Sequence, residues 1–144
     1  MNINESELFE VKESLKKIGR FTYQTIVRKL SEITLTGNLE IAREEYSGIL
    51  SELLLVSTSG VSGNDDYSVR VVADGNEVYN ETFSNFSAYY HSYCEDVSAN
   101  DDGSYIYLSI RDVFFTKSLK IEVFKIGSQV TFDRIIVKLY KKVA

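Results

Sequence analysis

Residues 67–76 read YSVRVVADGN, and this stretch decides the fold class. Apolar and polar side chains alternate along it up to Ala73, which is the pattern of a strand with one buried face. Asp74-Gly75 then provides the two residues that a tight hairpin turn needs, because both tolerate a positive φ. Glu77–Phe83 continues as a second strand. The sequence therefore predicts an antiparallel hairpin here.

Strands of the same kind are predicted on both sides of this hairpin. The further predicted segments are Phe21–Leu30, residues 33–35, residues 39–41, Ile49–Ser57, Tyr105–Phe115, Leu119–Val123 and Val130–Tyr140. Gly37-Asn38 is expected to close a two-residue hairpin, and the nearly continuous apolar run Ile49–Ser57 is expected to be a central strand buried on both faces. About eight strands without interleaved helices predict an all-β fold, an antiparallel sandwich or jelly roll.

The N-terminal segment is the one part of the sequence with a convincing helical pattern. Its narrow apolar seam consists of Leu8, Val11, Leu15 and Ile18. The 3-4-3 spacing predicts one short helix over residues 5–18, which is marginal in water without a partner. The helix either lies across one end of the sandwich or joins copies of the chain as a coiled coil. We therefore divide the chain into an N-terminal helical extension, 1–20, and a β-sandwich domain, 21–144.

Charge and composition exclude several classes of function. The net charge is −5 and no basic arm is present, so binding of nucleic acid is not expected. The longest apolar run, Leu53–Val56, is too short to span a membrane, and the N-terminus carries no secretory signal pattern. The single cysteine, Cys94, excludes an internal disulfide. We expect a protein made in the cytoplasm, with no membrane contact.

Residues 86–96 hold the only histidine and the only cysteine of the chain, His91 and Cys94. No catalytic signature surrounds Cys94, and sequence neighbours rarely form a nucleophile and its base. Together with Glu95 and Asp96 they lack the paired spacing of a zinc site. Residues 100–103, Asn-Asp-Asp-Gly, offer carboxylates that suit Ca²⁺, but they lack the glutamate that completes a calcium loop. The sequence alone does not decide whether they hold Ca²⁺. We expect a non-enzyme with no metal and no cofactor.

The same stretch contains a cluster of tyrosines, Tyr89, Tyr90 and Tyr93. A tyrosine offers a flat apolar face and a hydroxyl, which suits both protein and sugar surfaces. Packing in the core or between subunits explains such a cluster as well, and we favour packing over ligand binding. The three tyrosines are nevertheless the candidate binding surface of this sequence.

Three segments carry a resemblance to a known family. They read SGILSELLLVS at residues 47–57, YSVRVVADGN at 67–76 and FFTKSLKIEV at 114–123. They resemble the β-sandwich modules of tailed-phage virion proteins, in which G-x-L opens a central strand, V-x-V-x-x-D-G makes a hairpin and F-x-x-S-L-x-I enters a late strand. The likeness covers residues 47–140 and leaves out the N-terminal helix. It implies a non-enzymatic role in capsid decoration or in the tail, and it carries over no site residues.

These observations lead to one expected function and one alternative. The expected function is that of a structural virion protein, found in the virion after synthesis in the host cytoplasm. It would form homo-oligomers and join a larger protein assembly, with the seam of Leu8, Val11, Leu15 and Ile18 as the oligomer contact. The alternative is a carbohydrate-binding module with a galactose-binding-like sandwich, which would bind a glycan through the tyrosine cluster and could remain cytoplasmic.

Overall fold

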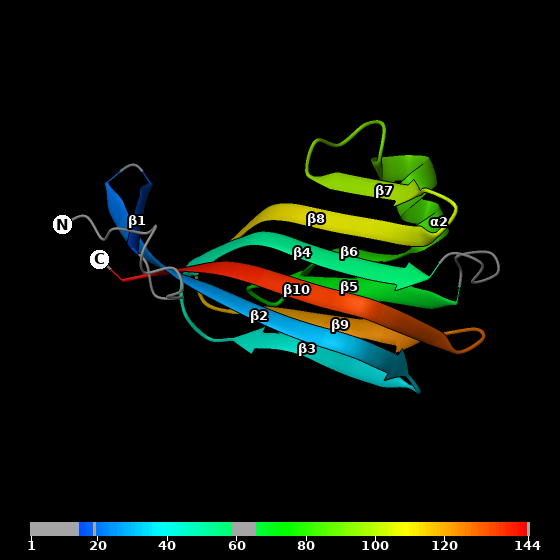
Figure 1. The fold of residues 1–144 in the computed structure, drawn as a ribbon. Coiled ribbons are helices and arrows are strands. Elements are labelled where there is room, and N and C mark those ends of the chain that lie inside the picture. The colour runs from blue at the N-terminus through cyan, green and yellow to red at the C-terminus, as the bar shows by residue number, and fades with distance from the viewer. Residues whose placement is uncertain (1–14, 19, 59–65, 144) are drawn as a thin grey trace.

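The computed structural model describes residues 15–18, 20–58 and 66–143 of the chain. They form two antiparallel sheets that face one another (Figure 1), which confirms the predicted all-β sandwich. The elements are β1 (Leu15–Ile18), β2 (Phe21–Leu35), β3 (Asn38–Glu44), β4 (Gly48–Thr58), β5 (Tyr67–Ala73), β6 (Asn76–Thr82), α2 (Phe83–Asn85), the π-helical turn η2 (Phe86–Tyr90), β7 (Val97–Asp101), β8 (Tyr105–Phe115), β9 (Leu119–Lys125) and β10 (Val130–Lys142).

The larger sheet has the strand order β1-β2-β10-β4-β8-β7, and the smaller sheet has the order β3-β9-β5-β6. Most consecutive strands therefore lie in different sheets. β2 and β3 are one such pair, so Gly37-Asn38 connects the two sheets and the predicted hairpin is wrong. The reason lies in the partners: β2 pairs with β10 from Tyr23 to Leu35, and β3 pairs with β9. These long pairings satisfy far more backbone groups than a short hairpin would.

The core lies between the sheets and follows the predicted alternation. Tyr67, Val69 and Val71 of β5 are buried, as expected. β4 lies between β10 and β8, so the prediction of a central strand is confirmed. Its outer face is not fully buried, because Ser51, Glu52 and Leu54 are half-buried. An edge-to-face contact joins the layers, with 5.0 Å between the ring centroids of Tyr67 and Phe132. Such aromatic pairs add stability to a core in addition to the stability that comes from burying their surface.

The hairpin between β5 and β6 has the turn that the sequence predicts. Asp74 and Gly75 both have a positive φ, 54° and 82°. Two such residues in succession are the mark of a type I′ turn, whose twist matches that of the strands it joins.

The predicted N-terminal helix is wrong for Leu15–Ile18, which form strand β1. This strand pairs with the start of β2, with Ile18 opposite Phe21 and Leu15 opposite Gln24. A marginal helix loses here to pairing with a strand edge that would otherwise lack partners. The rest of the predicted helix, with Leu8 and Val11, lies outside the described residues. β1 and the ends of β2 and β10 lie at one end of the molecule, beyond β3 (Figure 1).

The described short helix follows β6, where the chain returns from the smaller sheet to the larger one. The side chain of Thr82 caps its first turn by accepting a hydrogen bond from the backbone N–H of Asn85, at 3.2 Å. The π-helical turn ends where the N–H of His91 donates to the carbonyl of Phe86, at 2.9 Å. Strand β7 then adds to the edge of the larger sheet. It is too polar to be recognised as a strand from sequence.

Candidate functional site

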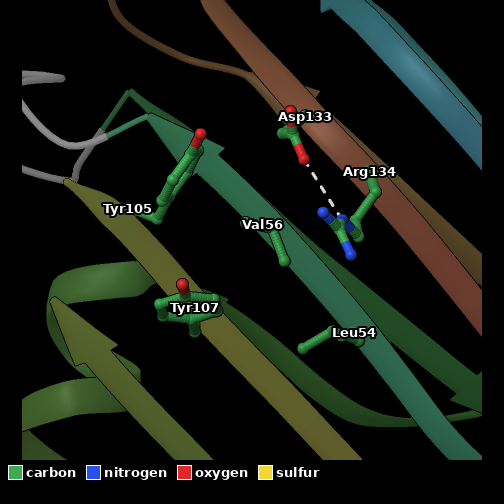
Figure 2. A pocket seen from close by; sticks show the side chains of 6 residues that line it. All are labelled: Leu54, Val56, Tyr105, Tyr107, Asp133 and Arg134. Atoms are coloured by element: carbon green, nitrogen blue, oxygen red, sulfur yellow. Dashed lines mark hydrogen bonds and ion pairs between the residues drawn. The ribbon is translucent and has the colours of Figure 1, made fainter. Parts of the chain in front are cut away.

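A groove crosses the outer face of the larger sheet, on the side away from the core. Figure 2 shows its deeper part, a hollow of about 180 Å³. Leu54 and Val56 of β4 form its floor. Two tyrosines of β8 stand on one side of the floor, and two charged residues of β10 stand on the other. The full lining is Leu54, Val56, Tyr105, Tyr107, Asp133 and Arg134.

A break in the side-chain alternation of β10 creates this hollow. Phe132 and Ile135 are three residues apart and yet both are fully buried in the core. The register between β10 and β4 shifts between Phe132 and Arg134, which marks a β-bulge. Asp133 and Arg134 therefore both reach the outer face. Bulges commonly re-aim side chains in this way.

The neighbouring strand β2 is irregular at the position that lies beside the bulge in β10. Glu32 has a φ of 53°, a conformation that is uncommon for residues other than glycine. Glu32 would face Asp133 in the β2–β10 register, and the two residues flanking it, Ser31 and Ile33, pair with Arg134 and Phe132. Both strands are thus distorted next to the groove.

The tyrosine side of the hollow is held in place by a neighbouring carboxylate. The rings of Tyr105 and Tyr107 lie side by side, with 6.3 Å between their centroids. The Asp102 side chain, whose charge acts on Tyr107, accepts hydrogen bonds from the N–H groups of Ser104 and Tyr105, each at 2.8 Å. These backbone hydrogen bonds lower the pKa of Asp102, and the pKa of Tyr107 is raised by desolvation and by the Asp102 charge.

On its other side the charged pair borders a second hollow of about 310 Å³. Its lining is Lys29, Ser31, Glu32, Asp133 and Arg134. Asp133 and Arg134 belong to both hollows, so the two are neighbouring parts of one groove. Asp133 and Arg134 form an ion pair, with 3.1 Å between Nε of Arg134 and Oδ2 of Asp133. One half of the groove is aromatic and apolar, and the other half is polar.

The predicted tyrosine cluster divides into two kinds of residue. Tyr90 packs against Tyr79 and Phe86, with ring centroids 5.7 and 5.3 Å away, and its hydroxyl donates to Glu81 at 3.0 Å. Tyr89 and Tyr93 are exposed, at 70% and 82%. Tyr90 therefore serves packing, while Tyr89 and Tyr93 are open to solvent.

His91 and Cys94 both make contacts that support the fold around them. The Nδ1 atom of His91 accepts a hydrogen bond from the backbone N–H of Ala99, at 3.0 Å, and so supports β7. Cys94 is half-buried and packs against the core. Within the described ranges, no three side chains of His, Cys, Asp or Glu gather closely enough to hold a metal ion.

Of residues 100–103, Asn100 and Asp101 end β7, and Asp102 and Gly103 begin the turn into β8. Asp101 accepts a hydrogen bond from the N–H of Gly103 at 3.0 Å, and Asp102 organises the next two amides. Their carboxylates thus fix the turn and the tyrosine side of the groove. The sequence contained no signal for the groove, because its residues come from separate strands and one strand breaks its alternation.

The outer face of the smaller sheet carries a row of charges that compensate each other. Arg70 lies between two glutamates, with 2.7 Å to Glu77 and 3.2 Å to Glu122, and Lys120 lies 3.5 Å from Glu122. The hydrogen bond with Glu77 is the main cause that raises the pKa of Arg70. Such exposed pairs contribute little to stability, and we regard this face as a solvated one.

No protein-family model matches the sequence, and no curated protein matches it either. The candidate site is therefore judged from its geometry. In the portion of the chain that the structure describes, no helix has both the length and the apolar character needed to cross a bilayer.

Proposed function

We propose that the chain is a non-enzymatic structural module of a virion-type assembly, a capsid-decoration or tail component that acts by contacting copies of itself and other proteins. Two observations support the proposal. The first is the order of the strands. The second, which is the main support for the proposal, is the open edge of β2.

The strand order supports a jelly roll as the finer description of the sandwich. Four strands in the order β2-β10-β4-β8 face four strands in the order β3-β9-β5-β6. Eight strands in two facing sheets are the basis of the jelly roll, which occurs in viral capsid and lectin domains. β1 and β7 are then additions at the two edges of the larger sheet. A fold alone does not assign a function, so the argument continues with the edge.

β2 is a long edge strand with apolar side chains that are exposed to solvent. Beyond Gln24, its side away from β10 pairs with no strand among the described residues. Val27 and Leu30 along this open stretch are 49% and 36% exposed. Long edges with exposed apolar residues are templates for pairing with another chain. We propose that β2 of a second copy occupies this edge, which gives a two-fold symmetric contact.

The test is the mass in solution, measured by light scattering behind a sizing column. We expect the wild-type chain to be a dimer or a larger closed oligomer. Val27→Lys combined with Leu30→Lys should give a monomer with an unchanged circular dichroism spectrum. Val78→Lys is the matched control, because Val78 is 43% exposed on β6, the edge of the other sheet. A monomeric wild-type chain would overturn the proposal.

A contact through the N-terminal segment, in which Leu15 and Ile18 belong to β1 rather than to the predicted helix, is tested in the same way. Val11→Asp combined with Leu15→Asp should separate the copies if the seam holds them together. If this variant becomes a monomer while the β2 variant stays associated, the contact lies in the seam rather than at the edge of β2.

Binding of carbohydrate is the second candidate function, and the groove on the larger sheet favours it. Binding sites for small molecules combine apolar and aromatic walls with a few polar groups. The groove has this composition, and the exposed Tyr89 and Tyr93 provide a second aromatic surface elsewhere. Retention on immobilised glycans tests this candidate. The wild-type chain should be retained, Tyr105→Ala should reduce retention if the groove binds the glycan, and Tyr89→Ala or Tyr93→Ala should reduce it if the exposed loop tyrosines bind it.

A further inference from the structure

We propose that the groove on the outer face of the larger sheet binds a short chain of neutral pyranose sugars, with one ring over the tyrosines and the next beside the charged pair. This inference rests on carbohydrate binding, the second candidate function, and deepens it by naming the site and the class of ligand. It is independent of self-association through β2.

The shape of the groove limits the ligand to small units. The deeper hollow measures about 180 Å³, below the range of about 300–1,000 Å³ that is typical of pockets for drug-sized ligands. The adjoining hollow measures about 310 Å³. A ligand built from linked small rings, with one ring in each hollow, fits two such neighbouring spaces.

The walls of the deeper hollow match the two faces of a pyranose ring. The apolar C–H face of a sugar packs on aromatic rings, and Tyr105, 37% exposed, presents such a ring beside the floor of Leu54 and Val56. Figure 2 shows Tyr105 and Tyr107 across this floor from Asp133 and Arg134. A ring seated on the floor would have its hydroxyl edge toward the charged pair.

The charged pair is suited to hydroxyl groups. Asp133 accepts hydrogen bonds, while the guanidinium of Arg134 carries five N–H donors, of which the bond to Asp133 engages Nε. Neighbouring hydroxyls of a sugar both donate and accept, so an acid and an arginine side by side can bind two of them. Hydrogen bonds to charged groups are also stronger than those between neutral groups.

The charge of the groove selects a neutral ligand. Lys29 and Arg134 are opposed by Glu32 and Asp133 in the lining of the polar hollow. The formal charges cancel, so the groove lacks the excess of cations that binding of phosphate, nucleic acid or an acidic sugar requires. A polar ligand without charge is therefore the class that fits.

The site is also held in shape before any ligand arrives. Asp102 fixes the turn that leads to Tyr105 by accepting hydrogen bonds from the N–H groups of Ser104 and Tyr105. The bulge in β10 sets the positions of Asp133 and Arg134 from the backbone. Sites that are rigid in advance lose less entropy on binding. Asp102 acts here as a positioning residue, since it is not part of the groove lining.

Isothermal titration calorimetry with defined trisaccharides tests the inference. The neutral probes are maltotriose, cellotriose, mannotriose and galactotriose, and sialyllactose is the anionic probe. We expect at least one neutral probe to bind the wild-type chain and sialyllactose to bind more weakly. Tyr105→Ala should weaken binding about tenfold or more, the effect of losing an aromatic anchor. Tyr105→Phe keeps the ring and should retain most of the affinity.

Phe114→Ala is the matched control, because it removes an aromatic ring that is 66% exposed and lies outside the groove lining. Tyr89→Ala tests the exposed loop tyrosines as the alternative site. Each variant is first checked for an unchanged melting temperature. If a neutral probe binds and Tyr89→Ala weakens it while Tyr105→Ala does not, the groove is not the site, although the chain binds carbohydrate. If no neutral probe binds at millimolar concentration, or if only sialyllactose binds, the inference is overturned.

Discussion

The carboxylate of Asp74 accepts a hydrogen bond from the backbone N–H of Lys117, with 2.6 Å between Oδ1 and N. The same carboxylate also accepts from the N–H groups of Thr116 and Ser118 and from the Thr116 hydroxyl. The turn between β5 and β6 thereby holds the loop that leads from β8 to β9. One half-buried side chain connects a hairpin of the smaller sheet to a crossover between the sheets.

This arrangement predicts a pH dependence of stability. The hydrogen bonds, those from the backbone of Thr116 first, lower the pKa of Asp74 from its ordinary 3.8 to about 2. The unfolded chain binds this proton more readily than the folded chain. The contribution of Asp74 is therefore fully present above its unfolded pKa and is lost as the pH falls from about 4 to about 2.

Asp74→Asn tests this dependence, because asparagine tolerates the positive φ but carries no charge. We expect a lower melting temperature than the wild type at pH 7 and a difference that shrinks as the pH falls toward 2. Thermal unfolding followed by circular dichroism measures both. Glu45→Gln, which removes an exposed carboxylate, controls for net charge. A difference that stays constant with pH would contradict the prediction.

Gly48, at the start of β4, has no room for a side chain. A Cβ atom at this position would lie 2.4 Å from the backbone oxygen of Tyr140 and 3.1 Å from Cζ of Phe115. Because the backbone of β10 cannot move aside without breaking its pairing, Gly48→Ala should lower the free energy of unfolding by about 1–3 kcal/mol or more. Chemical denaturation measures the change.

Gly37→Ala is the matched control for that substitution. Nothing lies within 4 Å of a Cβ atom at Gly37, so its replacement should change stability by no more than about 0.5 kcal/mol. Equal losses in the two variants would mean that close packing is not the reason for glycine at position 48.

The hydroxyl of Tyr67 is buried and has no hydrogen-bond partner among the described residues. Burial also raises the pKa of this group. A buried polar group without a partner costs stability, so Tyr67→Phe should leave the free energy of unfolding unchanged or raise it by up to about 1 kcal/mol. Tyr67→Ala, which removes the ring that packs on Phe132, should lower it by about 3–5 kcal/mol. A clear loss in the phenylalanine variant would reveal a partner for the hydroxyl.

His91 should protect the edge strand β7 from local opening. Its Nδ1 atom is the acceptor for the N–H of Ala99, so His91→Ala leaves this backbone group without its partner. We expect faster amide hydrogen exchange at Ala99 in the variant, measured by NMR, with little change in the central strand β4. Tyr93→Ala, a change at an exposed position on the same connection, should not alter the exchange of Ala99.

The part of the fold that could be predicted is the part set by local pattern. The alternation in β5 and the Asp74-Gly75 turn depend on neighbouring residues, and both are present in the structure. The Gly37-Asn38 turn has an equally good local signal, but its strands pair elsewhere. Which strands β2 and β3 pair with depends on β9 and β10, which lie far along the chain. The pattern within a single strand does not reveal that choice.

The groove could not be predicted for a related physical reason. It needs a bulge at Asp133, and Phe132 and Ile135 then face the same way against the regular alternation. Tyr105 and Tyr107 lie in a predicted strand, where alternation with Ile106 and Leu108 indicates an ordinary sheet and no site. The loop tyrosines have the stronger local signal, yet Tyr90 is a packing residue.

The order of the strands also determines when the protein can fold during its synthesis. β10 separates β2 from β4 in one sheet, and β9 separates β3 from β5 in the other. These two strands are made after all the others described here. While the ribosome is still producing them, β2 and β3 lack their main partners, and the nascent chain exposes apolar surface. We infer that the sandwich closes only after β9 and β10 have been synthesised, with slow, long-range pairing as its last step.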